Sequence, residues 1–420
     1  MLQLYDSWVE AIERGEMSAV VMIDQSAAFD CVDHNILKDK LALYGFDPDA
    51  LAWIESYMSE RKQSCHVEGF TSCPLSVSVG VPQGSILGPL MYCIFTNDFP
   101  EVVQEEECHP GDAETPTKYC THCRRCGGIT IYADDSTYTV SGTDQDELSE
   151  KISAKFKRMA DYLTANKLKV NSDKTHLLLM TTEQKRRHHP TTVKIETETE
   201  IIETTEVERL LGAYIHQDMK WTEYLRNNNN SLLHCLNARL GALKKISGSA
   251  SFKARLLVAN GIFMSKLIFM IPLWAGCPGF IIDALQVCQN KAARVVTRRG
   301  MDTPVSQLLK ECGWRSVRQE MYYHTVLQVH KTLGTGAPAY LYEKLTQGGH
   351  YPRDTRQSRS ISIRLGPTFS TRLELTRNSF RWRGAAWYEA LPVGIRKKQK
   401  FDRFKKELNV WVKLNIDMKK

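Results

Sequence analysis

Apolar residues follow two different spacings in the first part of the chain. Leu4, Trp8 and Ile12 recur every fourth residue, which predicts one apolar face of a helix over residues 3–14. Residues 18–24, "SAVVMID", form a short run rich in β-branched side chains. Such a run is typical of a buried strand.

The same two spacings divide the next two hundred residues into short helices and strands. We expect helices at 33–45, 48–60, 86–99 and 145–168, a hairpin over 63–84, strand–turn–strand over 129–140, a strand at 175–182 and a β-rich region at 192–216. Helices mixed with strands in this order predict an α+β fold with an antiparallel sheet backed by helices.

From Tyr224 onward the pattern is mostly helical. Residues 256–277 are apolar enough for their length to span a bilayer, but Asn260 and Lys266 interrupt them and Pro272 follows. A buried amphipathic helix is therefore the favoured interpretation. Because the start of the chain also lacks the pattern of a signal peptide, we expect an intracellular protein of the nucleus or cytoplasm, without membrane association. The oligomeric state is left open.

Charge is concentrated at the C-terminal end. The formal net charge of the chain is +7, and residues 351–420 hold 18 Lys and Arg against 6 Asp and Glu. This basic end predicts a polyanionic partner, with a solvated lysine-rich end as the alternative. Within it, Arg381, Trp382 and Arg383 place basic and aromatic residues together, which suits either nucleic-acid contact with stacking or a packed amphipathic helix.

Three acidic residues stand where strands are expected to end. Asp134 and Asp135 lie in "IYADDSTYT", at the predicted turn between two strands, and Asp24 ends the run "VVMID". Crowded carboxylates become tolerable when a divalent cation neutralises them. Three such acids could hold two Mg²⁺ ions for an in-line phosphoryl transfer. Alone, the Asp pair would be an ordinary surface turn.

Five motifs in order resemble the reverse transcriptase of non-LTR (LINE) retrotransposons of the jockey and CR1 kind. They are "MIDQSAAFDCVDHNIL", "GVPQGSILGPLMYCIFTNDFP", "YADDSTY", "LKVNSDKTHLLLM" and "RLLGAYIHQDMKW". The resemblance implies an RNA-directed DNA polymerase, a nucleotidyltransferase that adds dNTPs to the 3′-OH of a DNA primer on an RNA template.

The resemblance also assigns roles to single residues. Asp24, Asp134 and Asp135 match the acids that bind two Mg²⁺ ions, and Lys174 matches a lysine near the leaving pyrophosphate. Phe29 stands where the family has an aromatic gate, which would collide with a ribose 2′-OH and so select dNTPs.

Two further motifs imply contacts with the substrates. Gln83 and Gly84 of the "PQG" run match residues against the incoming nucleotide and the template. Leu211 and Gly212 resemble the tight turn of the hairpin that grips the primer. For Lys174, an ordinary surface lysine stays open as an alternative, and for Phe29, plain core packing.

The resemblance implies three regions and one insertion. We expect a polymerase palm with partial fingers at 1–222, a helical thumb or connection at 223–333, and a basic linker and C-terminal region at 334–420. The primer-grip hairpin is expected at about 192–216 and an insertion at 101–127. Because only 23 residues precede Asp24, we also expect an N-terminally truncated copy, and an inactive fragment that only binds nucleic acid is the alternative function.

The insertion holds a cluster of cysteines. Cys120, Cys123 and Cys126 are each separated by two residues, and Cys108 or His109 could complete a tetrahedral set. This spacing predicts a structural Zn²⁺ site, with free thiols as the alternative.

Overall fold

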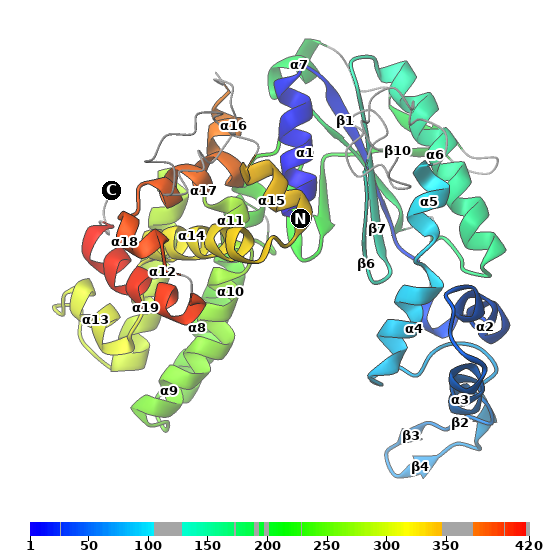
Figure 1. The fold of residues 1–420 in the computed structure, drawn as a ribbon. Coiled ribbons are helices and arrows are strands. Elements are labelled where there is room, and N and C mark those ends of the chain that lie inside the picture. Colours follow the sequence, from blue (N-terminus) through cyan, green and yellow to red (C-terminus); the bar gives the residue numbers. More distant parts are fainter. Residues whose placement is uncertain are drawn as a thin grey trace. The chain divides into compact units, whose positions relative to one another are not determined.

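The computed structural model divides the chain into two compact units (Figure 1). It describes residues 1–25, 27–104, 128–171, 174–188, 193–196, 201–227, 229–346, 373–398 and 400–416. The first unit is Gly15–Leu211, and the second combines Met1–Arg14 with Gly212–Lys420. The sequence placed the N-terminal helix with residues up to 222, whereas in the structure this helix clusters with the C-terminal half.

A six-stranded sheet forms the centre of the first unit. Its order is β6–β7–β1–β8–β10–β9. The strands are β1 (Met17–Ile23), β6 (Ile129–Tyr132), β7 (Asp135–Gly142), β8 (His176–Met180), β9 (Lys194–Glu196) and β10 (Ile201–Thr205). The fold is α+β, as expected, but the sheet is mixed, because β10 runs parallel to β8 while the other pairs are antiparallel. The chain passes through α7 (Glu183–His188) and β9 before it returns to β8 as β10, which makes parallel pairing possible.

The strand β1 lies in the middle of the sheet and is buried at all seven positions. Alternate side chains point to one face of a strand. Ala19 and Val21 therefore share one face, where they join a core with Ile152 and Phe156 of α6 (Gln145–Ala165). The helix predicted over 145–168 and the buried strand predicted at 18–24 are thus the two layers of this core.

Short helices and hairpins complete the first unit. They are the 3₁₀ turn η1 (Ala28–Asp30), α2 (His34–Leu43), α3 (Pro48–Met58), α4 (Leu87–Phe95) and α5 (Phe99–Gln104). Asp33 caps α2 by accepting hydrogen bonds from the backbone N–H groups of Asn35 and Ile36. The expected hairpin region is present as two short ladders, β2 (Lys62–Gln63) with β5 (Leu75–Ser76) and β3 (His66–Val67) with β4 (Phe70–Thr71).

The second unit is almost entirely helical, as the pattern after Tyr224 predicted. Its elements are α1 (Leu2–Glu13), β12 (Ala213–His216), η3 (Glu223–Asn227), α8 (Leu232–Ser247), α9 (Phe252–Val258), η4 (Ala259–Met264), α10 (Ser265–Ile268), α11 (Ile271–Trp274), α12 (Gly279–Thr297), α13 (Val305–Cys312), α14 (Val317–Thr335), α15 (Ala339–Thr346), α16 (Glu374–Asn378), α17 (Phe380–Glu389), α18 (Val393–Arg396) and α19 (Phe401–Asn415).

The long apolar stretch at 256–277 is not the single amphipathic helix that was expected. It is divided among α9, η4, α10 and α11, and Met270 adopts a left-handed conformation with φ of 54° immediately before α11. Pro272 then lies in the first turn of α11, where backbone N–H groups have no partner within the helix, so its missing N–H costs no helical hydrogen bond. Among the described helices, none is long and apolar enough to cross a membrane.

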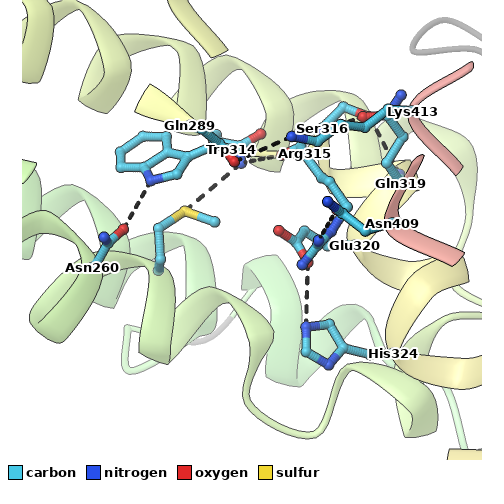
Figure 2. A network of polar contacts seen from close by, with 12 residues as sticks. Asn260, Gln289, Trp314, Arg315, Ser316, Gln319, Glu320, His324, Asn409 and Lys413 are labelled. Atoms are coloured by element: carbon cyan, nitrogen blue, oxygen red, sulfur yellow. Dashed lines mark hydrogen bonds and ion pairs between the residues drawn. The ribbon is translucent and has the colours of Figure 1, made fainter. Parts of the chain in front are cut away.

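A polar network around Arg315 ties three helices of the second unit together (Figure 2). The Arg315 guanidinium donates from Nε and Nη2 to Oε2 of Glu320 on α14, at 3.0 and 2.9 Å. Its Nη1 donates to Asn409 on α19, and its carbonyl oxygen accepts from Gln289 on α12. The guanidinium also lies 3.7 Å from the centroid of the Tyr323 ring. The side chain of Glu320 is 5% exposed and that of Arg315 is 17% exposed, so the ion pair is largely but not fully buried.

The helix α1 joins the second unit through both apolar and charged contacts. Trp8 is fully buried, and Glu10 pairs with Lys344 of α15 at 3.0 Å and with Arg381 of α17 at 2.8 Å. Arg383 donates to the carbonyl oxygen of Ala275. Arg381 and Arg383 are therefore engaged inside this unit, in keeping with the packed-helix alternative for this segment.

Candidate active site

The strand register brings two of the three expected acids side by side. Ile23, the last residue of β1, lies opposite Ser136 of β7. Asp24 directly follows Ile23 and Asp135 directly precedes Ser136, so the two acids flank this last pair of the register. The turn between β6 and β7 consists of Ala133 and Asp134, and it is closed by the pair Tyr132–Asp135.

The charges of Asp24 and Asp134 both act on the carboxyl group of Asp135. Burial, followed by the charges of Asp134 and Asp24, raises the pKa of Asp135 above its ordinary value. A like-charge effect of this kind requires that the carboxylates lie near one another. The acids that the sequence separates by 110 residues therefore belong to one site at the end of β1.

Lys174 supplies a positive charge next to these acids. Its Nζ lies 3.5 Å from Oδ2 of Asp24. The segment before it is fixed beside β1, because the N–H of Asn171 donates to the carbonyl oxygen of Asp24 at 3.0 Å and Gln25 forms a bridge with Val170. The sequence named this lysine only by resemblance, and the structure puts it in contact with the first acid.

The donor set has the chemistry that Mg²⁺ prefers, since all three side chains offer carboxylate oxygens. Burial and, after it, the charges of Asp134 and Asp24 raise the pKa of Asp135, and a cation would offset both effects. In the part of the chain that the structure describes, however, no three His, Cys, Asp or Glu side chains are already arranged as a metal-binding cluster. A cation would therefore require these side chains to turn toward it.

Phe29 lies in η1, five residues after Asp24, and its ring is supported from behind. It stacks on Tyr92 of α4 with ring centroids 4.5 Å apart. The Tyr92 hydroxyl donates to Oε1 of the buried Gln25 at 2.8 Å. Burial, and to a lesser degree the charge of Asp134, raises the pKa of Tyr92, which keeps this hydroxyl protonated as a donor.

Gln83 and Gly84 lie on the loop before α4, and this loop is bound to η1. The backbone N–H of Val81 donates to the carbonyl oxygen of Phe29 at 2.8 Å. The Gln83 side chain donates to both carboxylate oxygens of Asp30, at 2.8 and 2.9 Å. Gly84 has a φ of 79°, a conformation in which glycine is favoured.

The roles of two further groups of predicted residues stay predictions. Leu211 and Gly212 form a turn with φ of 48° and 85°, and the boundary between the two units falls between them. Their role at a primer therefore stays a prediction. Cys108, Cys120, Cys123 and Cys126 lie outside the described residues, and the expected zinc site stays a prediction as well.

Sequence analysis missed Asp30, Tyr92 and Gln25 as neighbours of the site. Asp30 directly follows Phe29, but an acid next to an aromatic residue carries no signal of its own. Tyr92 falls inside an apolar helix, where the pattern predicts only core packing. Only their contacts in the folded chain identify these residues as neighbours of Phe29 and Gln83.

Comparisons with known proteins relate this chain to one family. Residues 7–213 match the family described as reverse transcriptase (RNA-dependent DNA polymerase). Over 317 residues the chain is 24% identical to the probable RNA-directed DNA polymerase from transposon BS of Drosophila melanogaster, which covers 76% of this chain and 33% of that protein. Over 92 residues it is 37% identical to the RNA-directed DNA polymerase from mobile element jockey of the same species, which covers 22% of this chain and 10% of that protein.

Telomerase from Candida albicans, in complex with a fragment of telomeric RNA, is among the solved structures that match this chain. The TM-score is 0.41 at 10% identity, over 81% of this chain and 50% of that chain. This chain spans about a third of the length of the transposon BS relative. Through residues 7–213 the chain belongs to the reverse transcriptase family, and its relatives are the RNA-directed DNA polymerases of non-LTR retrotransposons of Drosophila.

Proposed function

We propose that this chain carries out RNA-templated DNA synthesis, adding dNTPs to the 3′-OH of a DNA primer on an RNA template. The observation that carries the proposal is the strand register that brings Asp24 and Asp135 to the same end of β1 and β7, next to Asp134 in the turn, within a reverse transcriptase domain. The template, the primer and the dNTPs are the partners that follow from it.

The acids would provide the metal site of this reaction. Two Mg²⁺ ions held by Asp24, Asp134 and Asp135 would lower the pKa of the primer hydroxyl and stabilise the pyrophosphate as it leaves. Lys174, 3.5 Å from Asp24, is positioned to offset negative charge at the same place, as a phosphate group arrives or departs.

Phe29 would select the sugar. A rigid ring beside the sugar leaves no space for a ribose 2′-OH, and the stacked Tyr92 prevents the ring from retreating toward α4. Gln83 and Gly84, on the loop bound to η1, would contact the incoming nucleotide and the template.

Primer extension tests the proposal. We expect Mg²⁺-dependent incorporation of dTTP on poly(rA)/oligo(dT), and we expect Asp134→Asn to abolish it because the substitution removes a negatively charged ligand. Asp39→Asn, which removes an exposed carboxylate on α2, is the matched control. Equal incorporation by wild type and Asp134→Asn would refute the proposal.

The same preparation tests the alternative of a fragment that only binds nucleic acid. Binding of poly(rA) that weakens steeply with salt, without incorporation by the wild type, would favour this alternative. Metal analysis of the purified chain tests the proposed Zn²⁺ site. One equivalent that is lost when Cys120 and Cys123 are replaced by Ser would support the site, and no bound zinc would remove it.

A further inference from the structure

An apolar groove lies along α18 and α19, which pack side by side in the second unit (Figure 1). Its volume is about 420 Å³. It is lined by Ile395 of α18 and by Lys406, Glu407, Val410, Trp411, Leu414 and Asn415 of α19. Because residues four apart lie on one face of a helix, Lys406, Val410 and Leu414 form a single stripe along α19.

The helix α19 carries two apolar faces, and the described part of the chain covers only one of them. The covered face holds Phe404, Leu408 and Val412, which are all fully buried in the core of the unit. The other face lies in the groove, where Val410 is 58% exposed and Leu414 is 79% exposed. Aliphatic side chains that adjoin one another in an exposed groove are typical of a docking surface.

Positive charge surrounds the groove. Residues 393–416 hold eight Lys and Arg against two Asp and Glu. Glu407, the acid among the lining residues, is paired with Lys398 at 3.0 Å. Lys406 lines the groove, and Arg403 lies one helical turn before Glu407 on the same face of α19. A ligand that combines apolar side chains with negative charge is therefore complementary to this surface.

The charge argues against a second copy of this chain as the occupant, because a symmetric contact would bring two basic surfaces together. The chemistry of the groove also argues against single-stranded nucleic acid. Bases stack on exposed aromatic rings. The exposed side chains of this groove are aliphatic, and its one aromatic ring, that of Trp411, packs against the ring of Tyr322 with centroids 5.5 Å apart.

We propose that the groove between α18 and α19 docks an acidic amphipathic helix of a partner protein. A helix with apolar residues at every third and fourth position can lay that face into an apolar groove. Its apolar side chains cover Val410 and Leu414, and its carboxylates face Lys406 and Arg403. This docking site is independent of the proposed polymerase activity, since none of its residues belongs to the unit that holds the acids.

Fluorescence anisotropy with a designed peptide tests the proposal. The probe is a fluorescein-labelled helix of about 16 residues made of Leu, Ala and Glu, with Leu at every third and fourth position. We expect saturable binding to the full chain that weakens as salt rises, because the ion pairs are exposed. A peptide with Gln in place of each Leu keeps the charge and should not bind.

Substitutions of exposed residues test the apolar part of the groove without disturbing the core. Leu414→Ser should weaken binding of the peptide by about tenfold, because the complex no longer covers a leucine. Leu257→Ser is the matched control. It replaces a leucine of α9 that is 73% exposed and lies outside the groove, and it should bind the peptide as the wild type does.

Reversal of charge tests the electrostatic part. A peptide with Lys in place of each Glu should not bind the wild type. In Arg403→Glu with Lys406→Glu the preference should reverse, so that the Lys peptide binds and the Glu peptide does not. A variant that merely failed to fold would bind neither peptide, and circular dichroism would identify it.

Four results would overturn the proposal. They are the absence of saturable binding, equal affinity of the wild type for the Glu and Lys peptides, a wild-type affinity in Leu414→Ser, and an equal loss in Leu257→Ser. Two measurements identify another occupant. Binding of poly(rA) that Leu414→Ser weakens, without binding of the peptide, would assign the groove to nucleic acid. A dimer in sedimentation that Leu414→Ser dissociates would assign it to a second copy.

Discussion

Replacing Asp6 by Asn is expected to change how the stability of the second unit depends on pH. Asp6 lies on α1 with 2% of its surface exposed, and both of its carboxylate oxygens are buried without a hydrogen-bond partner in the described structure. Burial raises the pKa of Asp6 to about 6. The charges of Lys344, Arg381 and the N-terminal amine oppose this shift, and the charge of Glu10 adds to it.

The sign and size of the effect follow from linkage. An unfolded Asp titrates near its ordinary pKa of 3.8, so between about pH 4 and 6 the folded state binds more protons than the unfolded state. The free energy of unfolding therefore falls as the pH rises through this window. At pH 5, which is about one unit below the folded-state pKa, the protonated Asp6 contributes about 1.4 kcal/mol to the free energy of unfolding, and by pH 8 this contribution is lost.

Urea unfolding at pH 5, 6, 7 and 8, followed by tryptophan fluorescence, measures this difference. Seven of the eight tryptophans lie in the second unit, because Trp53 belongs to the first, so the signal reports mainly on the unit that contains Asp6. The difference in free energy of unfolding between Asp6→Asn and the wild type should shift by about 1.4 kcal/mol in favour of the variant as the pH rises from 5 to 8. Asp302→Asn replaces an exposed carboxyl in the same unit, and its free energy of unfolding should depend on pH as that of the wild type does.

A constant difference between Asp6→Asn and wild type from pH 5 to pH 8 would refute the reasoning, whatever its size. Such a result would mean that Asp6 ionises equally easily in the folded and unfolded chains, and hence that its carboxylate reaches water or a cation.

Three further changes probe other contacts. Tyr92→Leu removes the ring that stacks on Phe29 and should raise incorporation of UTP relative to dTTP. Tyr92→Phe keeps the stacked ring and should keep the selectivity for dTTP. Equal selectivity of Tyr92→Leu and the wild type would contradict the stacking argument. Glu320→Ala should lower the free energy of unfolding in urea by about 3 kcal/mol, because the largely buried guanidinium of Arg315 loses its partner, and a wild-type transition midpoint would argue against this. Gly80→Ala combines a φ of 88° with a backbone clash at 2.8 Å, and should lower the free energy of unfolding by about 1–3 kcal/mol. Gly15→Ala, whose φ is also positive but whose Cβ would meet open space, should cost less, and an equal loss would show that the clash is relieved.

The sequence determined the local elements and the identity of the acids. The fourfold spacing of Leu4, Trp8 and Ile12 predicted α1, and all three side chains are buried. The β-branched run before Asp24 predicted the central strand β1. These predictions succeed because helix and strand periodicity depend only on which face of an element is apolar.

The tertiary structure decided the pairing of distant segments. The spacing of apolar residues does not specify register. It therefore could not predict the pairing of Ile23 with Ser136, which brings Asp24 and Asp135 to one end of the sheet, or the parallel pairing of β10 with β8. The assignment of α1 to the C-terminal half depends on Glu10 meeting Arg381, 371 residues away. The hydrogen bond from Gln83 to Asp30 also joins side chains 53 residues apart, so it exists only once the backbone has folded.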